Sequence, residues 1–152
     1  MLQRIQHIFL LLSAVATGLM IFKPLVSIEV AGGESAFMFA GAIRTEGAGE
    51  TILSCIPLMF LICLITAISL LTIFLYKKRL LQMRFTVYNM ILMVGLIVLG
   101  YYYASKGANE ISGDIQLTFY TVMPVVSFIL SLLAWRGVRR DYLMLKAVER
   151  IR

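Results

Sequence analysis

The feature that most constrains this chain is a set of four long stretches without any side chain that is charged at pH 7. They cover residues 5–22, 51–76, 85–105 and 115–135. The shortest has 18 residues, and a helix needs about 17–20 to cross roughly 30 Å of hydrocarbon. Lipid offers no partner to open backbone groups, so such stretches must be helical. The sequence predicts four spans at about residues 5–24, 51–76, 85–105 and 115–136.

Composition agrees with a membrane protein. Hydrophobic residues make up 61% of the chain and charged residues 14%, against roughly 45–50% and about 25% in soluble domains. A soluble protein of 152 residues could not bury that much apolar surface, so we expect one membrane domain, 1–152. The net charge of +6 does not indicate nucleic-acid binding, because the basic residues flank the apolar stretches instead of sharing one face.

The basic residues also predict the direction of the spans. Eleven lie before the first span, in the 77–84 loop or after the fourth span, and three lie on the other side, at Lys23, Arg44 and Lys106. Because basic loops stay in the cytoplasm, both termini are expected inside. A cleavable signal peptide ending at Ala14–Ala16 is the alternative for the first span. Its apolar part, residues 8–12, would be shorter than usual, so we expect the helix to remain.

Two segments outside the spans have patterns of their own. In the outer loop 25–50, Val26, Ile28 and Val30 alternate with other residues ahead of the glycines at 32–33, which predicts a small β-hairpin. Residues 41–49 are interpreted as a flexible connection. The cytoplasmic tail, 137–152, carries an apolar stripe among basic residues, which predicts an amphipathic helix. This helix is expected on anionic headgroups or docked under the bundle, with docking on a partner as the alternative. The stripe consists of Val138, Tyr142, Leu145, Val148 and Ile151.

The spans contain few polar groups. Asn89 is the strongest polar side chain at depth, and its amide is expected to bond to a carbonyl or hydroxyl of a neighbouring helix. Pro57 and Pro124 are expected to bend the second and fourth spans. Cys55 and Cys63 are eight residues apart on one expected helix, about 12 Å, too far for a disulfide. Both are interpreted as packing residues.

The pattern of reactive residues predicts no enzyme. The sequence contains no Gly-rich phosphate loop, no nucleophile near a base and no carboxylate pair within a span. We therefore expect no catalytic residue, no cofactor and no metal site. An enzyme acting on lipid would need acids that converge at one interface, and the outer acids, such as Glu46 and Glu50, are interpreted as a solvated rim.

Three segments support a family resemblance: residues 1–6 (MLQRIQ), residues 78–84 (KRLLQMR) and residues 140–152, which open on Arg140-Asp141 and close on Glu149-Arg150-Ile151-Arg152. With four spans in these positions, the chain resembles a bacterial family of small membrane proteins, domain of unknown function 4293. The resemblance implies an inner-membrane protein and no assigned activity. It also points to a cytoplasmic polar cluster, in which Arg79 or Arg84 would pair with Asp141 or Glu149. The expected cluster comprises Gln3, Arg4, Arg79, Gln82, Arg84, Asp141, Glu149 and Arg150.

The sequence thus predicts an all-α membrane protein: a four-helix transmembrane bundle with a small outer hairpin and a cytoplasmic amphipathic helix. The expected function is that of a non-enzymatic accessory or scaffold subunit, whose partners are the lipid bilayer and other membrane proteins or a second copy of itself. The alternative is a small oligomeric carrier or channel for a neutral or apolar solute. Its path would use Asn89, Thr66, Ser69 and Ser127.

Overall fold

A computed structural model describes residues 2–29, 35–46, 51–75 and 78–149. The side chains at 2–6, 79, 145, 148 and 149 lie outside this description. The elements follow one another as α1 (Leu2–Phe22), β1 (Val26–Glu29), β2 (Ser35–Met38), β3 (Ala42–Thr45), β4 (Thr51–Ser54), α2 (Ile56–Phe74), α3 (Arg79–Ile111), β5 (Asp114–Leu117), a 3₁₀ helix (Phe119–Val122) and α4 (Met123–Glu149).

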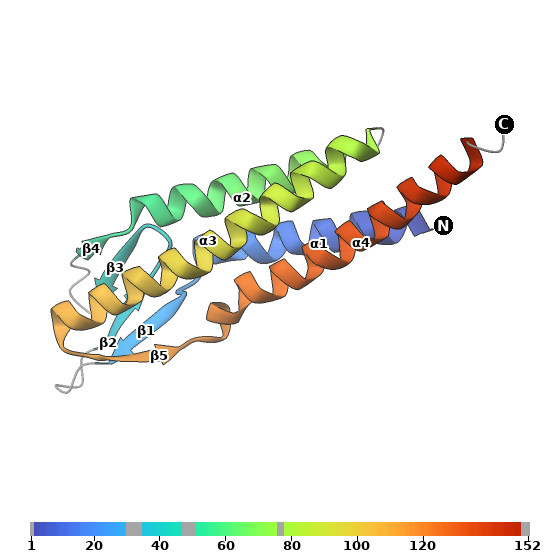
Figure 1. The fold of residues 1–152 in the computed structure, drawn as a ribbon. Helices are drawn as coiled ribbons and strands as arrows, with labels where there is room; N and C mark the ends of the chain where they lie inside the picture. Colours follow the sequence, from blue (N-terminus) through green and yellow to red (C-terminus); the bar gives the residue numbers. More distant parts are fainter. Residues whose placement is uncertain (1, 30–34, 47–50, 76–77, 150–152) are drawn as a thin grey trace.

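The four helices lie side by side along most of their length (Figure 1). α1 packs against α2 and α4, and α3 packs against the same two helices. The N-terminus and the C-terminal end of α4 lie at one end of the molecule, and the strands lie at the other (Figure 1). We call these the terminal end and the sheet end.

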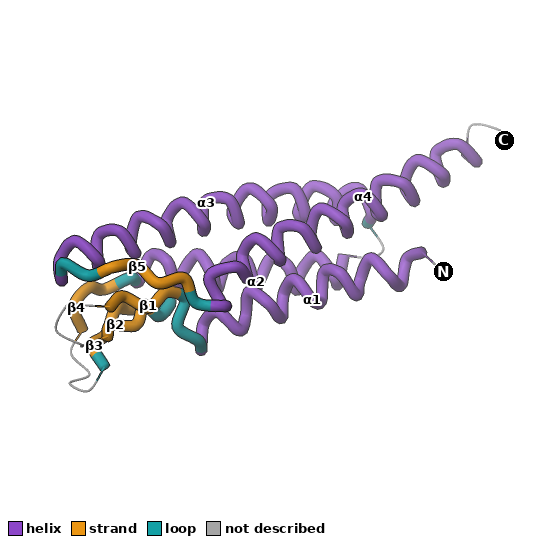
Figure 2. The backbone as a smooth tube through the Cα atoms, turned by 90° about the horizontal axis from the view of Figure 1, so that it is seen from below, coloured by secondary structure: helices purple, strands orange, loops and turns teal. Residues whose placement is uncertain are grey.

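The strands form one antiparallel sheet in the order β4-β3-β2-β1-β5. β1 lies between β2 and β5, and its Val26 lies opposite Met38 of β2 and Leu117 of β5. Alternate residues of β1 to β3 point into the core, and Ile28, Met38 and Ile43 are fully buried. They pack in one cluster with apolar residues from the ends of the helices. The sheet therefore covers one end of the helices, as Figure 2 shows.

This sheet corrects the expected fold class. An all-α protein with a small hairpin is wrong, because the structure contains four helices and a five-stranded sheet. Residues 42–45, taken for a flexible connection, form β3. Residues 51–54 and 115–117, taken for the beginnings of the second and fourth spans, belong to β4 and β5. A short apolar run beside a helix can be either helix or strand by periodicity alone, and here pairing with distant strands decides.

The two prolines explain where the helices begin. Pro57 is the second residue of α2, and Pro124 is the second residue of α4. In the first turn of a helix a proline removes no helical hydrogen bond, and its fixed φ favours the helix. The expected bends in the spans are therefore wrong, and both prolines instead mark the change from strand or 3₁₀ turn to α-helix.

The connection from α3 to β5 is unusually tight. Ser112 ends the helix in a left-handed conformation, with φ of 49°, and the Gly113 amide donates to the Ala108 carbonyl at 3.0 Å. A Cβ placed on Gly113 would lie 2.8 Å from the Glu29 carbonyl oxygen and 2.8 Å from Cγ2 of Ile28. Only glycine allows β5 to pair with β1 so soon after the helix.

Among the described residues, three helical segments are long and apolar enough to cross a membrane: Ile56–Phe74, Leu80–Ile111 and Phe119–Met144. The apolar part of α1, His7–Phe22, is shorter. Within an apolar stretch of 18 residues in each segment, only 22% to 28% of the residues are buried within the chain. Most of their apolar surface thus faces outward, which is unfavourable in water and ordinary in lipid.

α4 runs without interruption from the sheet end to Glu149. The expected amphipathic tail is therefore the last part of a 27-residue helix. Within its apolar stripe, Val138 is buried and Tyr142 is half-buried. The side chains of Leu145 and Val148, and Ile151 as a whole, lie outside the description.

Candidate functional site: polar contacts between the helices and an arginine groove

Asn89 lies in the interior between α2 and α3, where its side chain is 1% exposed. Its Nδ2 donates to the Ser69 hydroxyl at 2.8 Å, and Ser69 is also fully buried. A hydroxyl on a neighbouring helix is the kind of partner that a buried amide requires. The Asn89 Oδ1 has no hydrogen-bond partner among the described residues.

Two hydroxyl pairs and one hydroxyl–carbonyl contact join α1 to its neighbours. Ser13 contacts α4, because its hydroxyl lies 3.2 Å from the Ser127 carbonyl, to which it donates, and 3.0 Å from the Ser131 hydroxyl. On the other side of α1, Thr66 of α2 donates to the Thr17 hydroxyl at 3.3 Å. We call these contacts, with Asn89–Ser69, the polar seam. The seam consists of Ser13, Thr17, Thr66, Ser69, Asn89, Ser127 and Ser131.

The seam contains no group that titrates near neutral pH, so its chemistry is limited to hydrogen bonding. Several of its hydroxyls also bond within their own helix; Thr17, for example, donates to the Ser13 carbonyl at 3.0 Å. Such contacts fix the register of neighbouring helices in an apolar environment. The residues expected to line a path, Thr66, Ser69, Asn89 and Ser127, are distributed over three different helix contacts: α1–α2, α2–α3 and α1–α4.

Gln82 occupies a different place from the one expected. The sequence places Gln82 in the cytoplasmic 77–84 loop. In the structure, α3 already begins at Arg79, and Gln82 is 3% exposed. Its Nε2 has no hydrogen-bond partner among the described residues. Gln82, Thr86, Asn89 and Met93 follow one another at spacings of four, three and four, so they share one buried helix face. That spacing was the signal in the sequence that identifies Gln82 as an interior residue.

The rest of the expected cytoplasmic cluster is only partly described. Arg84 is exposed and lines a shallow hollow of about 250 Å³ beside Trp135. Asp141 is half-buried and interacts with other residues of the chain. The side chains of Gln3, Arg4, Arg79 and Glu149 lie outside the description, as does the whole of Arg150. The pairing of an inner-loop arginine with Asp141 or Glu149 therefore stays a prediction.

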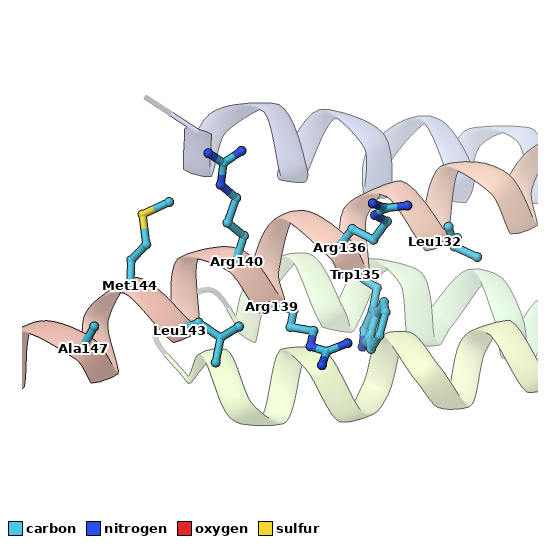
Figure 3. A pocket seen from close by; sticks show the side chains of 8 residues that line it. All are labelled: Leu132, Trp135, Arg136, Arg139, Arg140, Leu143, Met144 and Ala147. Atoms are coloured by element: carbon cyan, nitrogen blue, oxygen red, sulfur yellow. The ribbon is translucent and has the colours of Figure 1, made fainter.

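A groove runs along α4 at the terminal end of the molecule. It is open, has a volume of about 680 Å³, and is lined by cationic and apolar side chains together (Figure 3). The Arg139 guanidinium carbon lies 5.2 Å from the centre of the Trp135 ring, within cation–π distance. Arg140 points from α4 toward the N-terminal end of α1 (Figure 3). We call this the arginine groove; it is lined by Leu132, Trp135, Arg136, Arg139, Arg140, Leu143, Met144 and Ala147.

The lining of the groove suits an anionic amphiphile. Arginine binds phosphate through several donors, and Leu132, Leu143 and Met144 can contact the apolar chain of such a molecule. The sequence also predicts a basic amphipathic helix here, but from a different set of residues. The apolar stripe expected from the sequence begins at Val138, and Val138 packs into the interior of the molecule.

The two cysteines differ. Cys55 is fully buried in the turn between β4 and α2, and burial raises the pKa of its thiol from 9.0 to about 11. The thiol therefore stays protonated at neutral pH. Cys63 is a free thiol on the exposed surface of α2.

A search of the curated proteins finds no match to this chain. A protein-family model described as "Domain of unknown function (DUF4293)" matches residues 2–151, which is nearly the whole chain. The match includes all four helices and the five strands. The protein therefore belongs to the DUF4293 family.

Proposed function

We propose that this protein is a non-enzymatic accessory or scaffold subunit of the bacterial inner membrane. The polar seam is the observation that carries this proposal. Ser69 and Asn89 bond to each other, and the hydroxyls of Ser13 and Thr17 are bonded to α4 and α2. Polar groups engaged in this way hold the helices together.

The membrane placement rests on the outward apolar surface and on charge. Three helical segments have the length of a span, and α1 would be the fourth. The described cations of the terminal end include Arg136, Arg139 and Arg140, whereas Lys23, Arg44 and Lys106 belong to the sheet end. Because basic segments remain in the cytoplasm, we place both termini inside and the sheet outside.

Two features favour a role in assembly. Among the described residues no strand pairs with the outer edge of β4 or of β5, and all four residues of β5 are exposed. An open edge accepts a strand from another protein. On the other side of the membrane, α4 carries the arginine groove. A partner or a second copy therefore has surfaces to contact on both sides.

The test is purification of the tagged full-length protein in several mild detergents, followed by quantitative mass spectrometry. The proposal predicts one defined complex, with another membrane protein or with a second copy, at a constant ratio in every detergent. A variant with Ile115→Pro, whose amide faces away from β1, blocks the β5 edge and is expected to reduce binding of an edge-bound partner. Val98→Ala on α3 serves as control. Recovery of free monomer under all conditions would contradict the proposal.

The second candidate is an oligomeric carrier for a neutral solute. It is favoured by the two buried polar atoms without described partners, Gln82 Nε2 and Asn89 Oδ1, on one face of α3. A water or solute molecule beside each of these atoms would satisfy it. Osmotic swelling of proteoliposomes with small neutral solutes tests it: the wild type would conduct and the Gln82→Leu/Asn89→Leu variant would not. Equal permeability of protein-containing and empty vesicles would reject it.

A further inference from the structure

An apolar cavity of about 200 Å³ lies where the sheet meets the helices. Its floor is formed by buried side chains from α1, β2, α2 and α3, namely Met20, Met38, Leu58 and Leu96. Apolar cavities of about 150 Å³ in proteins stay dry and bind benzene-sized molecules. The size and lining of this cavity therefore suit a hydrocarbon ligand.

The polar content of the lining is small. Thr121 contributes a hydroxyl, but that hydroxyl already donates to the Leu25 carbonyl. No lining side chain carries a charge at neutral pH. An occupant with a charged or strongly polar group inside the cavity would lose its hydration without compensation, so the occupant must be apolar at this point.

The cavity opens sideways. Its lining includes three exposed residues of the helices, Ile97 and Tyr101 of α3 and Val125 of α4, whose side chains are 39%, 73% and 44% exposed. It also includes two exposed residues of β5, Ile115 and Leu117, at 39% and 78%. The three helical residues belong to the outward faces of two helices that we place in the membrane. An acyl chain of the surrounding lipid can therefore enter between α3 and α4 without passing through water.

Gly100 of α3 keeps this space open. It lines the cavity, and a Cβ built on it would meet no atom within 4 Å. Any larger side chain at this position would fill volume that is now accessible. Gly95, on the same helix, also has no atom within 4 Å of a built Cβ, but it is exposed and does not line the cavity.

We propose that the cavity beneath the sheet binds an acyl chain of a membrane lipid, which enters between α3 and α4. The bound chain completes the packing between the helix ends and the sheet. This inference rests on the membrane placement proposed above and not on the accessory role.

The experiment uses full-length protein in vesicles of phosphatidylethanolamine and phosphatidylglycerol that contain a phospholipid with a diazirine in one acyl chain. After illumination, mass spectrometry locates the cross-links. In the wild type, we expect cross-links to floor residues such as Met38 and Leu58. Gly100→Leu is expected to lose them, and the matched control Gly95→Leu is expected to retain them, since both variants gain the same side chain on one helix.

A second pair of variants tests the mouth from the opposite side. Val125→Trp narrows the opening on α4 and is expected to lose the floor cross-links, whereas Val126→Trp, 40% exposed and outside the lining, is expected to retain them. If Gly100→Leu does not fold, as judged by circular dichroism, this pair tests the acyl-chain site in its place.

Cross-links to Val98, which is 65% exposed on α3, report on membrane placement independently of the cavity. Cross-links at Val98 without any at the floor of the wild type would overturn the acyl-chain site and leave the placement intact. Floor cross-links that persist equally in Gly100→Leu and Val125→Trp would also overturn it, as would co-purification of a different apolar molecule in the cavity.

Discussion

Asn89 and Gln82 show how much the place of one polar residue depends on helix register. Asn89 could be identified from the sequence, because it lies within an uncharged stretch and an amide at depth needs a partner. Gln82 could not be identified by the same argument, because four charged residues surround it in KKRLLQMR. The early beginning of α3 at Arg79 turns Gln82 inward.

The hydrogen bond between Asn89 and Ser69 predicts an asymmetric pair of variants. Ser69→Ala leaves a buried amide without a partner and should lower the free energy of unfolding by about 1–2 kcal/mol. Adding Asn89→Leu removes the unsatisfied amide, so the double variant should regain most of that loss. Equilibrium unfolding in bicelles measures both.

The control for this pair is Cys63→Ala on the exposed face of α2, which should change stability by less than about 0.5 kcal/mol. If Ser69→Ala is as stable as the wild type, or if the double variant is less stable than the single one, Asn89 and Ser69 do not form the contact described.

At the scale of elements, the helices were predictable and the sheet was not. Long uncharged runs identify a helix through the cost of open backbone in lipid, which is a local argument. Strands β4 and β5 depend on pairing with β3 and β1, whose residues are distant in sequence. Pro57 and Pro124 gave the only local sign that the second and fourth helices begin late.

Gly113 provides a test of the sheet. In Gly113→Ala, the new Cβ would lie 2.8 Å from the Glu29 carbonyl oxygen, so β1 and β5 must separate. We expect a loss of about 1–3 kcal/mol in the free energy of unfolding and faster hydrogen exchange at β1 and β5 amides. Gly95→Ala, which meets nothing within 4 Å, should instead stabilise by roughly 0.5–1 kcal/mol. Equal stability of the two variants would refute the close approach.

α4 carries its own prediction, because Trp135 is the only tryptophan of the chain and lies in the arginine groove. Brominated phosphatidylglycerol should quench its fluorescence more than brominated phosphatidylcholine at the same mole fraction, since each basic residue adds about 1 kcal/mol of attraction to anionic lipid. The Arg136→Gln/Arg139→Gln/Arg140→Gln variant should remove the difference. Quenching that does not depend on the headgroup in the wild type would exclude a preference for anionic lipid.

At the scale of the whole molecule, four helices are held together by the polar seam and covered at one end by the sheet. The seam and the sheet stabilise the molecule from within. The outward surface of the helices is largely apolar. Net charge separates the two ends in the same sense as the positive-inside rule. The sequence predicted this separation because it depends only on the order of charges and apolar stretches.

The proposed topology puts the sheet and the terminal end on opposite sides of the bacterial inner membrane. Single cysteines at exposed positions in a Cys55→Ala/Cys63→Ala background test it: Glu46→Cys at the sheet end, and Lys78→Cys and Lys146→Cys at the terminal end. In intact spheroplasts, a membrane-impermeant maleimide should label Glu46→Cys at once, and should label Lys78→Cys and Lys146→Cys only after the membrane is opened. Labelling of Lys78→Cys or Lys146→Cys from outside would contradict the account.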